Sequence, residues 1–185
     1  MEIAIVGQGY VGLPLALQFA RSGVRVLGLD IDPAKVEALN AGQSYIRHIP
    51  SEWIAEQRAA GRFSASTDFS RVREVEAVII CVPTPLNKNR EPDISYILST
   101  GRAIAPYLQR GALVVLESTT YPGTTDTDLR AVLEEGSGMR AGVDFHLAFS
   151  PEREDPGNPQ SRVAEIPKVV GGLTPACLER ACALY

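Results

Sequence analysis

The sequence predicts an α/β domain with a doubly wound, mostly parallel sheet and helices on both faces. Two observations lead to this prediction. Apolar stretches of strand length alternate with stretches of helical pattern along the chain, and most of the strand stretches are apolar at nearly every position. A strand that is apolar on both sides is buried on both sides. A parallel sheet with helices packed on each face provides that burial.

A glycine-rich turn joins the first two predicted elements, the strand Glu2–Val6 and the helix Val11–Ser22. A second strand follows at Arg25–Asp30. Pro33–Asn40 is predicted to be a helix, because proline suits the first helical turn and Gly42 follows the last.

The rest of the chain repeats this alternation of strand and helix. Ser51 is a suitable N-cap for the next helix. The remaining predicted elements are, in chain order, the helix Ser51–Ala60, the strands Phe63–Ser66 and Ala77–Val82, the helix Ser95–Leu108, the strand Ala112–Glu117, the helix Thr125–Glu135, the strand Phe145–Phe149, a candidate short strand at Lys168–Val170 and the helix Pro175–Tyr185.

Composition excludes several classes of function. The 185 residues are 45% hydrophobic and 22% charged, which is ordinary for a globular protein, and the net charge of −4 argues against non-specific nucleic-acid binding. We see neither an apolar run long enough to span a membrane nor a signal peptide, so the expected location is the cytoplasm. Three cysteines and two histidines fit neither a disulfide framework nor a metal site, and no metal is expected.

A G-x-G-x-x-G motif occupies residues 7–12, between the first strand and the first helix. This context is typical of a Rossmann dinucleotide site. Gly7 permits the tight turn, Gly9 lets a pyrophosphate approach the backbone, and Gly12 lets the helix pack close to the sheet. The helix N-terminus offers N–H groups and partial positive charge to the anion.

An acidic residue, Asp30, ends the second strand 18 residues after Gly12, close to the spacing of roughly 20 that the motif requires. Its carboxylate is suited to accept hydrogen bonds from ribose hydroxyls and would repel a 2′-phosphate. Ile31 and Asp32 follow it, with no arginine to receive that phosphate. The predicted cofactor is therefore NAD rather than NADP; FAD-binding proteins share the motif, but the later loops argue against FAD.

Three later strands end in loops that are polar and marked by glycine or proline. Ligands of open α/β sheets bind outside the carboxyl ends of the strands, so these loops are expected to border the same site as the glycine turn. They comprise residues 81–85, 118–124 and 150–154.

These loops, taken with the glycine turn, resemble the UDP-glucose/GDP-mannose 6-dehydrogenase family, and most closely its branch that acts on UDP-N-acetylhexosamines. The resemblance extends through nearly the whole chain. The supporting segments are residues 5–14, 81–88, 90–93, 118–124, 150–154 and 166–172.

The resemblance implies a four-electron oxidation of the C6 alcohol of a UDP-sugar to a carboxylate, with two NAD⁺ used in succession and a cysteine thioester on the way. The resemblance also implies that this reaction serves polysaccharide biosynthesis. The reaction requires a thiolate nucleophile and acid–base groups.

The resemblance also assigns individual residues. Thr119 corresponds to the threonine that helps to hold a catalytic water, and Glu152 to the acid that assists proton transfer and thioester hydrolysis; these two are the predicted catalytic residues. The predicted cofactor-binding residues are Gly7, Gly9, Tyr10, Val11, Gly12, Asp30, Lys35 on the ribose side, Thr84 and Thr119.

Two departures from the family pattern have consequences. The UDP-glucose branch has a second glutamate four residues after the first, where this chain has Pro156, which favours the acetylated-sugar branch. The family's nucleophilic cysteine lies in a glycine-rich segment beyond Tyr185. Residues 1–185 are therefore expected to be the NAD-binding domain of a longer, homo-oligomeric enzyme, without its dimerisation helix and C-terminal UDP-sugar domain. Alone they should bind NAD without turnover, and the identity of the UDP-sugar stays open.

Simpler interpretations remain open for several of these residues. Thr119 or Thr120 could cap the helix that follows, and Glu152 could belong to an exposed charged cluster. Cys81 is expected to be a buried core thiol rather than a nucleophile, and Cys177 and Cys182 to be packing residues.

Two other functions are compatible with a dinucleotide-binding fold. A sugar-nucleotide epimerase or short-chain reductase needs Tyr-x-x-x-Lys, and no tyrosine of the chain has lysine four residues later. A stand-alone NAD-sensing module would need only the cofactor site. A continuation of the chain that contains the cysteine segment would support the dehydrogenase over the sensor.

Overall fold

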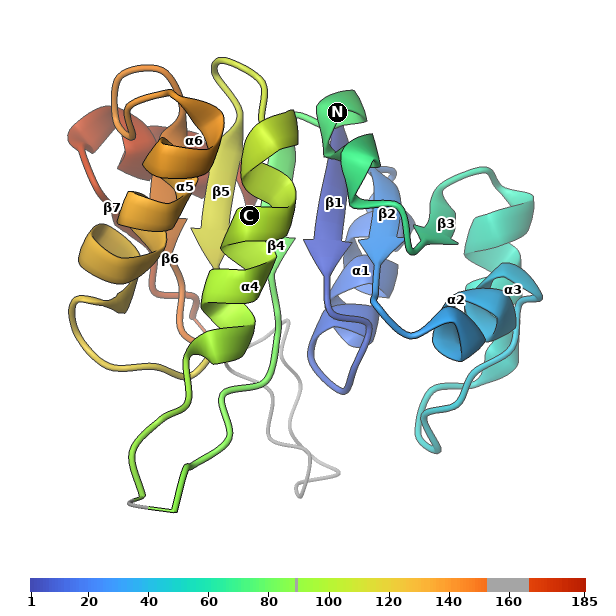
Figure 1. Cartoon of the computed structure of the whole chain (residues 1–185). Helices are drawn as coiled ribbons and strands as arrows, with labels where there is room; N and C mark the ends of the chain where they lie inside the picture. Colours follow the sequence, from blue (N-terminus) through green and yellow to red (C-terminus); the bar gives the residue numbers. More distant parts are fainter. Residues whose placement is uncertain (89, 153–166) are drawn as a thin grey trace.

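One seven-stranded sheet forms the centre of the computed structural model, which describes residues 1–88, 90–152 and 167–185 (Figure 1). The strand order is β3-β2-β1-β4-β5-β6-β7; β1 to β6 are parallel and β7 is antiparallel to β6. The predicted doubly wound, mostly parallel sheet is therefore confirmed. The strands are β1 Glu2–Val6, β2 Arg25–Leu29, β3 Phe63–Ser66, β4 Ala77–Ile80, β5 Leu113–Leu116, β6 His146–Phe149 and β7 Gly171–Gly172.

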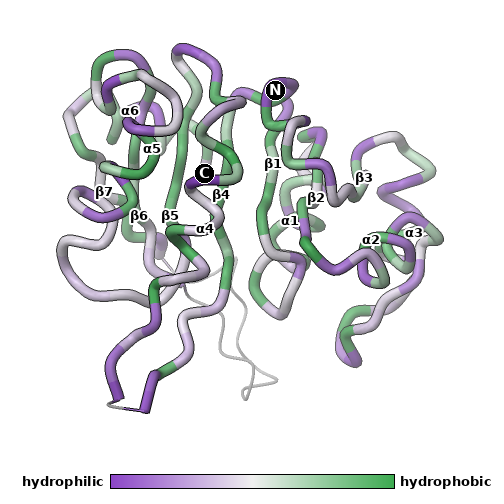
Figure 2. Tube along the Cα trace, in the orientation of Figure 1, coloured by the Kyte–Doolittle hydropathy of each residue, from purple (hydrophilic) through white to green (hydrophobic). Residues whose placement is uncertain are grey.

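Helices cover both faces of the sheet because successive residues of each strand point to opposite sides. On one face, Ile3 and Ile5 of β1 share a core with α1 and α6. On the other face, Ala4 and Val6 pack in a core with α4 and α5. Figure 2 shows the hydrophobic residues concentrated along these central strands. The α-helices are α1 Gly12–Arg21, α2 Pro33–Asn40, α3 Ser51–Ala59, α4 Ser95–Ile104, α5 Arg130–Ser137 and α6 Pro175–Leu184.

Several predicted elements differ from those observed. The last strand lies at Gly171–Gly172 instead of Lys168–Val170. The helix expected at Ser95–Leu108 ends as α4 at Ile104 and continues as a short 3₁₀ turn that contains Pro106, which lacks the N–H that an α-helix needs. A 3₁₀ helix at Phe69–Glu74 was not predicted.

The helix predicted at Thr125–Glu135 begins as a π-helical segment, Thr124–Leu129, before it continues as α5. The prediction that both Cys177 and Cys182 are packing residues is half wrong, because Cys177 is buried and Cys182 is exposed. The two positions are five apart on a helix and so point in different directions. Within the described ranges, every helix is too short or too polar to cross a membrane.

A pair of adjacent glycines in β7 gives a direct test of how α6 packs on the sheet edge. A Cβ added at Gly172 would lie 2.2 Å from the backbone nitrogen of Leu178, whereas one at Gly171 would meet only the Phe149 carbonyl oxygen, at 3.9 Å. Backbone cannot yield as a flexible side chain does. We expect Gly172→Ala to lower the free energy of unfolding by about 2 kcal/mol and the Tm by roughly 4–8 °C.

Thermal unfolding followed by circular dichroism measures both changes. Gly171→Ala is the matched control and should leave the Tm near that of the unmodified chain. Equal Tm values for the two variants would contradict the close contact between β7 and α6.

Candidate functional site

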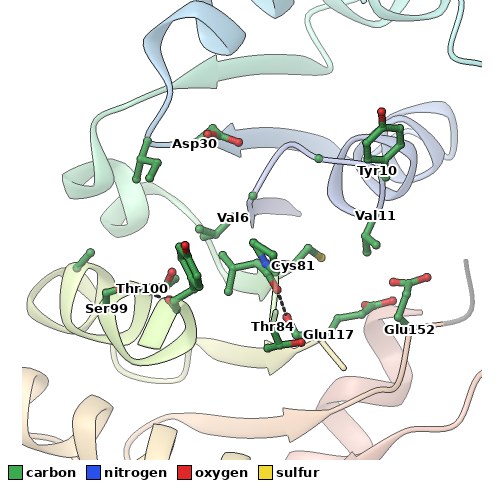
Figure 3. A pocket seen from close by; sticks show the side chains of 18 of the residues that line it. Val6, Tyr10, Val11, Asp30, Cys81, Thr84, Ser99, Thr100, Glu117 and Glu152 are labelled. Atoms are coloured by element: carbon green, nitrogen blue, oxygen red, sulfur yellow. Dashed lines mark hydrogen bonds between the residues drawn. The ribbon is translucent and has the colours of Figure 1, made fainter. Parts of the chain in front are cut away.

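A cleft of about 810 Å³ lies at the carboxyl edge of the sheet (Figure 3). The chain proceeds from β1 through α1 to β2 on one side, and from β4 through α4 to β5 on the other. The neighbouring strands β1 and β4 therefore mark the topological switch point, where open α/β sheets bind their ligands. Loops that follow β1, β2, β4, β5 and β6 all contribute to the lining of the cleft.

The glycine turn is shaped by contacts that leave no room for side chains at two of its three glycines. Gly7 has φ +91°, and a Cβ there would lie 2.6 Å from the Cys81 carbonyl oxygen. A Cβ at Gly12 would lie 1.8 Å from the carbonyl oxygen of Gly7. These contacts require glycine whether or not a ligand is bound.

Gly9 differs from the other two glycines, because a Cβ there would meet nothing within 4 Å. It lines the cleft together with Tyr10 and Val11, directly before the N-terminus of α1, a helix of ten residues with no side-chain cap at that end. Uncapped N–H groups and the partial positive charge of the helix suit a phosphate. The open space at Gly9 is therefore suited to a pyrophosphate group.

Asp30 lies in the same cleft and is 6% exposed. Its carboxylate accepts hydrogen bonds from the backbone N–H groups of Gln8 (2.8 Å) and Asp32 (3.0 Å), and the Nζ of Lys35 lies 3.5 Å from it. A carboxylate has about four acceptor positions, so capacity remains for ribose hydroxyls. Asp30 also connects the end of β2 to the glycine turn, a structural role that was not predicted from the sequence.

Two tyrosine side chains, Tyr45 and Tyr10, lie at the glycine turn. The Tyr45 hydroxyl donates a hydrogen bond to the Gln8 carbonyl oxygen at 2.5 Å, and burial, followed by the charges of Asp30 and Asp32, raises the pKa of Tyr45. Tyr10 is exposed and stacks on His48, with 6.1 Å between ring centroids. Tyr45 was not among the predicted site residues, because it lies in a loop without a motif.

Hydrogen bonds join the loops after β4 and β5. The Thr84 hydroxyl donates to the carbonyl oxygen of Thr119 at 2.5 Å, and the Ser118 hydroxyl donates to the carbonyl oxygen of Val82 at 2.9 Å. Neither Thr119 nor Thr120 caps the following helical segment, whose N-cap is Gly123 without a side-chain hydrogen bond. The capping interpretation is therefore wrong, and Thr84 and Thr119 both line the cleft.

Glu117, which directly follows the apolar strand β5, lines the cleft although it was not among the predicted site residues. It is 2% exposed, forms an ion pair with Lys168 and accepts a hydrogen bond from the Tyr185 hydroxyl at 2.5 Å. Burial raises the pKa of Glu117, while Lys168 and Tyr185 oppose that rise. A glutamate directly after four buried apolar residues was the available signal.

Cys81 also lines the cleft, but it is buried, and burial raises the pKa of its thiol well above the usual range. A thiol of this kind is a poor nucleophile, because the thiolate is the reactive form. This agrees with its interpretation as a core residue. The residues described by the structure contain no group of three or more side chains suited to hold a metal.

The structure brings the predicted site residues together. Gly7, Gly9, Tyr10, Val11, Asp30, Lys35, Thr84, Thr119 and Glu152 all line the cleft, and Gly12 packs directly behind the turn. Arg153, Glu154 and Pro156, the last of which bears on the choice of sugar, lie outside the described residues.

Residues 1–185 match the family profile "UDP-glucose/GDP-mannose dehydrogenase family, NAD binding domain" over their whole length. The UDP-N-acetyl-D-glucosamine 6-dehydrogenase of Pseudomonas aeruginosa is 36% identical over 185 residues, which cover 100% of this chain and 43% of that protein. The UDP-N-acetyl-D-mannosamine dehydrogenase of Pyrococcus horikoshii is 37% identical over 186 residues, with 100% and 44% covered. The chain thus spans less than half the length of these relatives.

Two of the solved structures that resemble this chain are also nucleotide-sugar dehydrogenases. An NDP-N-acetyl-D-galactosaminuronic acid dehydrogenase from Methanosarcina mazei Go1 superposes with a TM-score of 0.93 at 38% identity, covering 100% of this chain and 41% of that one. A GDP-mannose dehydrogenase from Pseudomonas aeruginosa, solved as a ternary complex, superposes with a TM-score of 0.91 at 31% identity, covering 100% and 44%.

Proposed function

The chain belongs to the UDP-glucose/GDP-mannose dehydrogenase family as its NAD-binding domain, and on this premise we propose that it serves a dehydrogenase that oxidises the C6 alcohol of a UDP-sugar to a carboxylate. The proposed substrate class is UDP-N-acetylhexosamines, because the two relatives described above are named for UDP-N-acetyl-D-glucosamine and UDP-N-acetyl-D-mannosamine. The observation that carries the proposal is the open glycine turn at the N-terminus of α1, with Asp30 in the same cleft.

The residues of the cleft suit two parts of NAD, its pyrophosphate and its adenosine ribose. The turn at Gly7 and Gly9 and the N-terminus of α1 would hold the pyrophosphate, and Asp30 with Lys35 would hold the adenosine ribose. The acidic side chain at the ribose position would repel a 2′-phosphate. Bound NAD supplies the acceptor for the hydride that leaves the alcohol carbon.

Two side chains are proposed to act on the substrate. The Glu152 carboxyl group, which lines the cleft, would exchange protons with the reacting alcohol and later assist hydrolysis. The Thr119 hydroxyl would hold the attacking water. In support of this role, the hydrogen bond from the Thr84 hydroxyl to the Thr119 carbonyl oxygen connects the Thr119 loop to the loop after β4.

We further propose that residues 1–185 bind NAD without turnover and that the nucleophilic cysteine belongs to a segment outside them. Cys81, the cysteine that lines the cleft, is buried with a raised pKa, and Cys177 and Cys182 are not part of the cleft lining. Three unpaired thiols also suit a reducing compartment such as the cytoplasm. Homo-oligomerisation of the longer enzyme remains a prediction.

Calorimetric titration of residues 1–185 with NAD⁺ and then with NADP⁺ tests the cofactor assignment. We expect saturable binding of NAD⁺ and binding of NADP⁺ that is weaker by roughly tenfold or more, because Asp30 would repel the additional phosphate. Equal affinities, or no binding of either nucleotide to a folded sample, would contradict the assignment.

A further inference from the structure

Gln8, the second residue of the glycine turn, is held by groups that come from two other parts of the chain. Its backbone N–H donates to the Asp30 carboxylate at 2.8 Å, and its carbonyl oxygen accepts a hydrogen bond from the Tyr45 hydroxyl at 2.5 Å. Asp30 follows β2, whereas Tyr45 belongs to the loop between α2 and α3. The contact from Tyr45 is the one that acts on the peptide group between Gln8 and Gly9.

This contact sets the direction of the N–H groups that follow in the turn. The C=O and the N–H of a trans peptide point to opposite sides. Because the Gln8 carbonyl points to Tyr45, the N–H of Gly9 points away from Tyr45. Gly9 lines the cleft and Tyr45 is not part of its lining. The Gly9 carbonyl in turn accepts the N–H of Leu13 at 3.1 Å, so the N–H of Tyr10 points outward from the N-terminus of α1. Successive N–H groups of this kind form a concave site for an anion.

The loop that carries Tyr45 is itself anchored in the domain. Figure 1 shows this loop, between α2 and α3, at the carboxyl edge of the sheet. Ile46 and Ile49 are 3% and 4% exposed and pack in the core that also contains residues of α1. His48 of the same loop stacks on Tyr10. The position of the Tyr45 hydroxyl is therefore set by the core and by a second contact with the turn.

We propose that Tyr45 is a positioning residue for the cofactor, because its hydroxyl orients the peptide between Gln8 and Gly9 so that the N–H groups at the start of α1 meet the pyrophosphate. The inference rests on the proposed function, and it adds a residue outside the glycine motif to the pyrophosphate site. N–H groups that are oriented before binding incur a smaller ordering cost when the phosphate arrives. Without the hydroxyl, the Gln8 carbonyl would bond to water, which does not hold the peptide in one orientation.

Tyr45→Phe tests this role, because it removes the hydroxyl and keeps the ring. Two probes separate the parts of the site: ADP-ribose contains the adenosine and the pyrophosphate of NAD, and adenosine contains no phosphate. Both are titrated into residues 1–185 and followed by ¹H–¹⁵N NMR spectra. We expect the Kd for ADP-ribose to rise by about three- to tenfold, the effect typical of one hydrogen bond. The Kd for adenosine should change by less than about twofold, since the ribose contact at Asp30 is retained.

The amide signals of the turn provide a second readout, which a general loss of stability would not move. On addition of ADP-ribose to the unmodified chain, the amide signals of Gly9 and Tyr10 should shift, and at saturation the shift of Gly9 should be smaller in Tyr45→Phe. Tyr107→Phe is the matched control. It removes a hydroxyl from a tyrosine in the 3₁₀ turn after α4, which is not part of the cleft lining, and it should leave both Kd values and the amide shifts unchanged.

The outcomes distinguish the inference from the proposed function. If neither NAD⁺ nor ADP-ribose binds to the folded unmodified chain, the proposed function fails. If ADP-ribose binds to Tyr45→Phe with a Kd within about twofold of that for the unmodified chain, the positioning role is overturned and the cofactor assignment stands. An equal rise in the Kd for adenosine also overturns the role, because Tyr45 would then act on the whole site.

The Gly9 amide decides the result if adenosine binds too weakly for a Kd or if Tyr45→Phe does not fold. In the first case, a Gly9 shift that is the same in Tyr45→Phe and in the unmodified chain overturns the inference. In the second case, the unmodified chain is sufficient, since a Gly9 amide signal that does not move when ADP-ribose binds overturns it.

Discussion

Replacement of Gly9 by valine is expected to abolish measurable NAD binding without unfolding the domain. The protein itself leaves space at this position, because a Cβ would meet nothing within 4 Å. A valine side chain would fill the approach to the N-terminus of α1, where the pyrophosphate is proposed to lie. We expect the Kd for NAD⁺ to rise by about 100-fold or more, which is roughly 2.7 kcal/mol of binding free energy.

Gly12→Ala serves as the contrasting variant. Its added Cβ would lie 1.8 Å from the carbonyl oxygen of Gly7, so it should lower the Tm, whereas Gly9→Val should not. Thermal unfolding and calorimetric titration of both variants separate the two effects. A folded Gly9→Val domain that binds NAD⁺ normally would show that the pyrophosphate does not approach at Gly9.

The sequence was sufficient to predict those parts of the fold and site that depend on local chemistry. The glycine turn follows from short-range backbone requirements, which are visible as the spacing of Gly7, Gly9 and Gly12. The buried strands follow from uninterrupted apolar runs. Because parallel strands have their carboxyl ends at one edge, the sequence alone predicts that the loops after these strands meet in one cleft.

The sequence was insufficient where a feature depends on partners that are distant along the chain. Glu117 is held by Lys168 and Tyr185, which are 51 and 68 residues away, and no local pattern announces either contact. β7 consists of two glycines, which have low strand propensity, and it forms because they pair with β6. The hydrogen bond from the Gln8 N–H to the Asp30 carboxylate likewise joins segments that are distant along the chain, after β1 and after β2. The motif spacing therefore indicated the ligand-binding role of Asp30 but not this structural role.

Asp30→Ala is expected to weaken NAD⁺ binding by about 10- to 100-fold and to narrow the preference for NAD⁺ over NADP⁺. A hydrogen bond to a charged group contributes about 1.5–3 kcal/mol, and loss of the ribose contact accounts for most of this change. The preference narrows because the negative charge that would repel a 2′-phosphate is removed. Calorimetric Kd values for both nucleotides measure the two effects.

The structural role of Asp30 makes a second variant necessary. Alanine also removes the acceptor for the backbone N–H groups of Gln8 and Asp32, so part of its effect would come from a loosened glycine turn. The Asp30→Asn variant keeps one side-chain oxygen for the Gln8 N–H but has no charge at this position. If charge decides selectivity, the preference for NAD⁺ narrows in both variants, while the affinity for NAD⁺ falls less in Asp30→Asn. If both variants retain the affinity and selectivity of the unmodified chain, the adenosine ribose is not bound at Asp30.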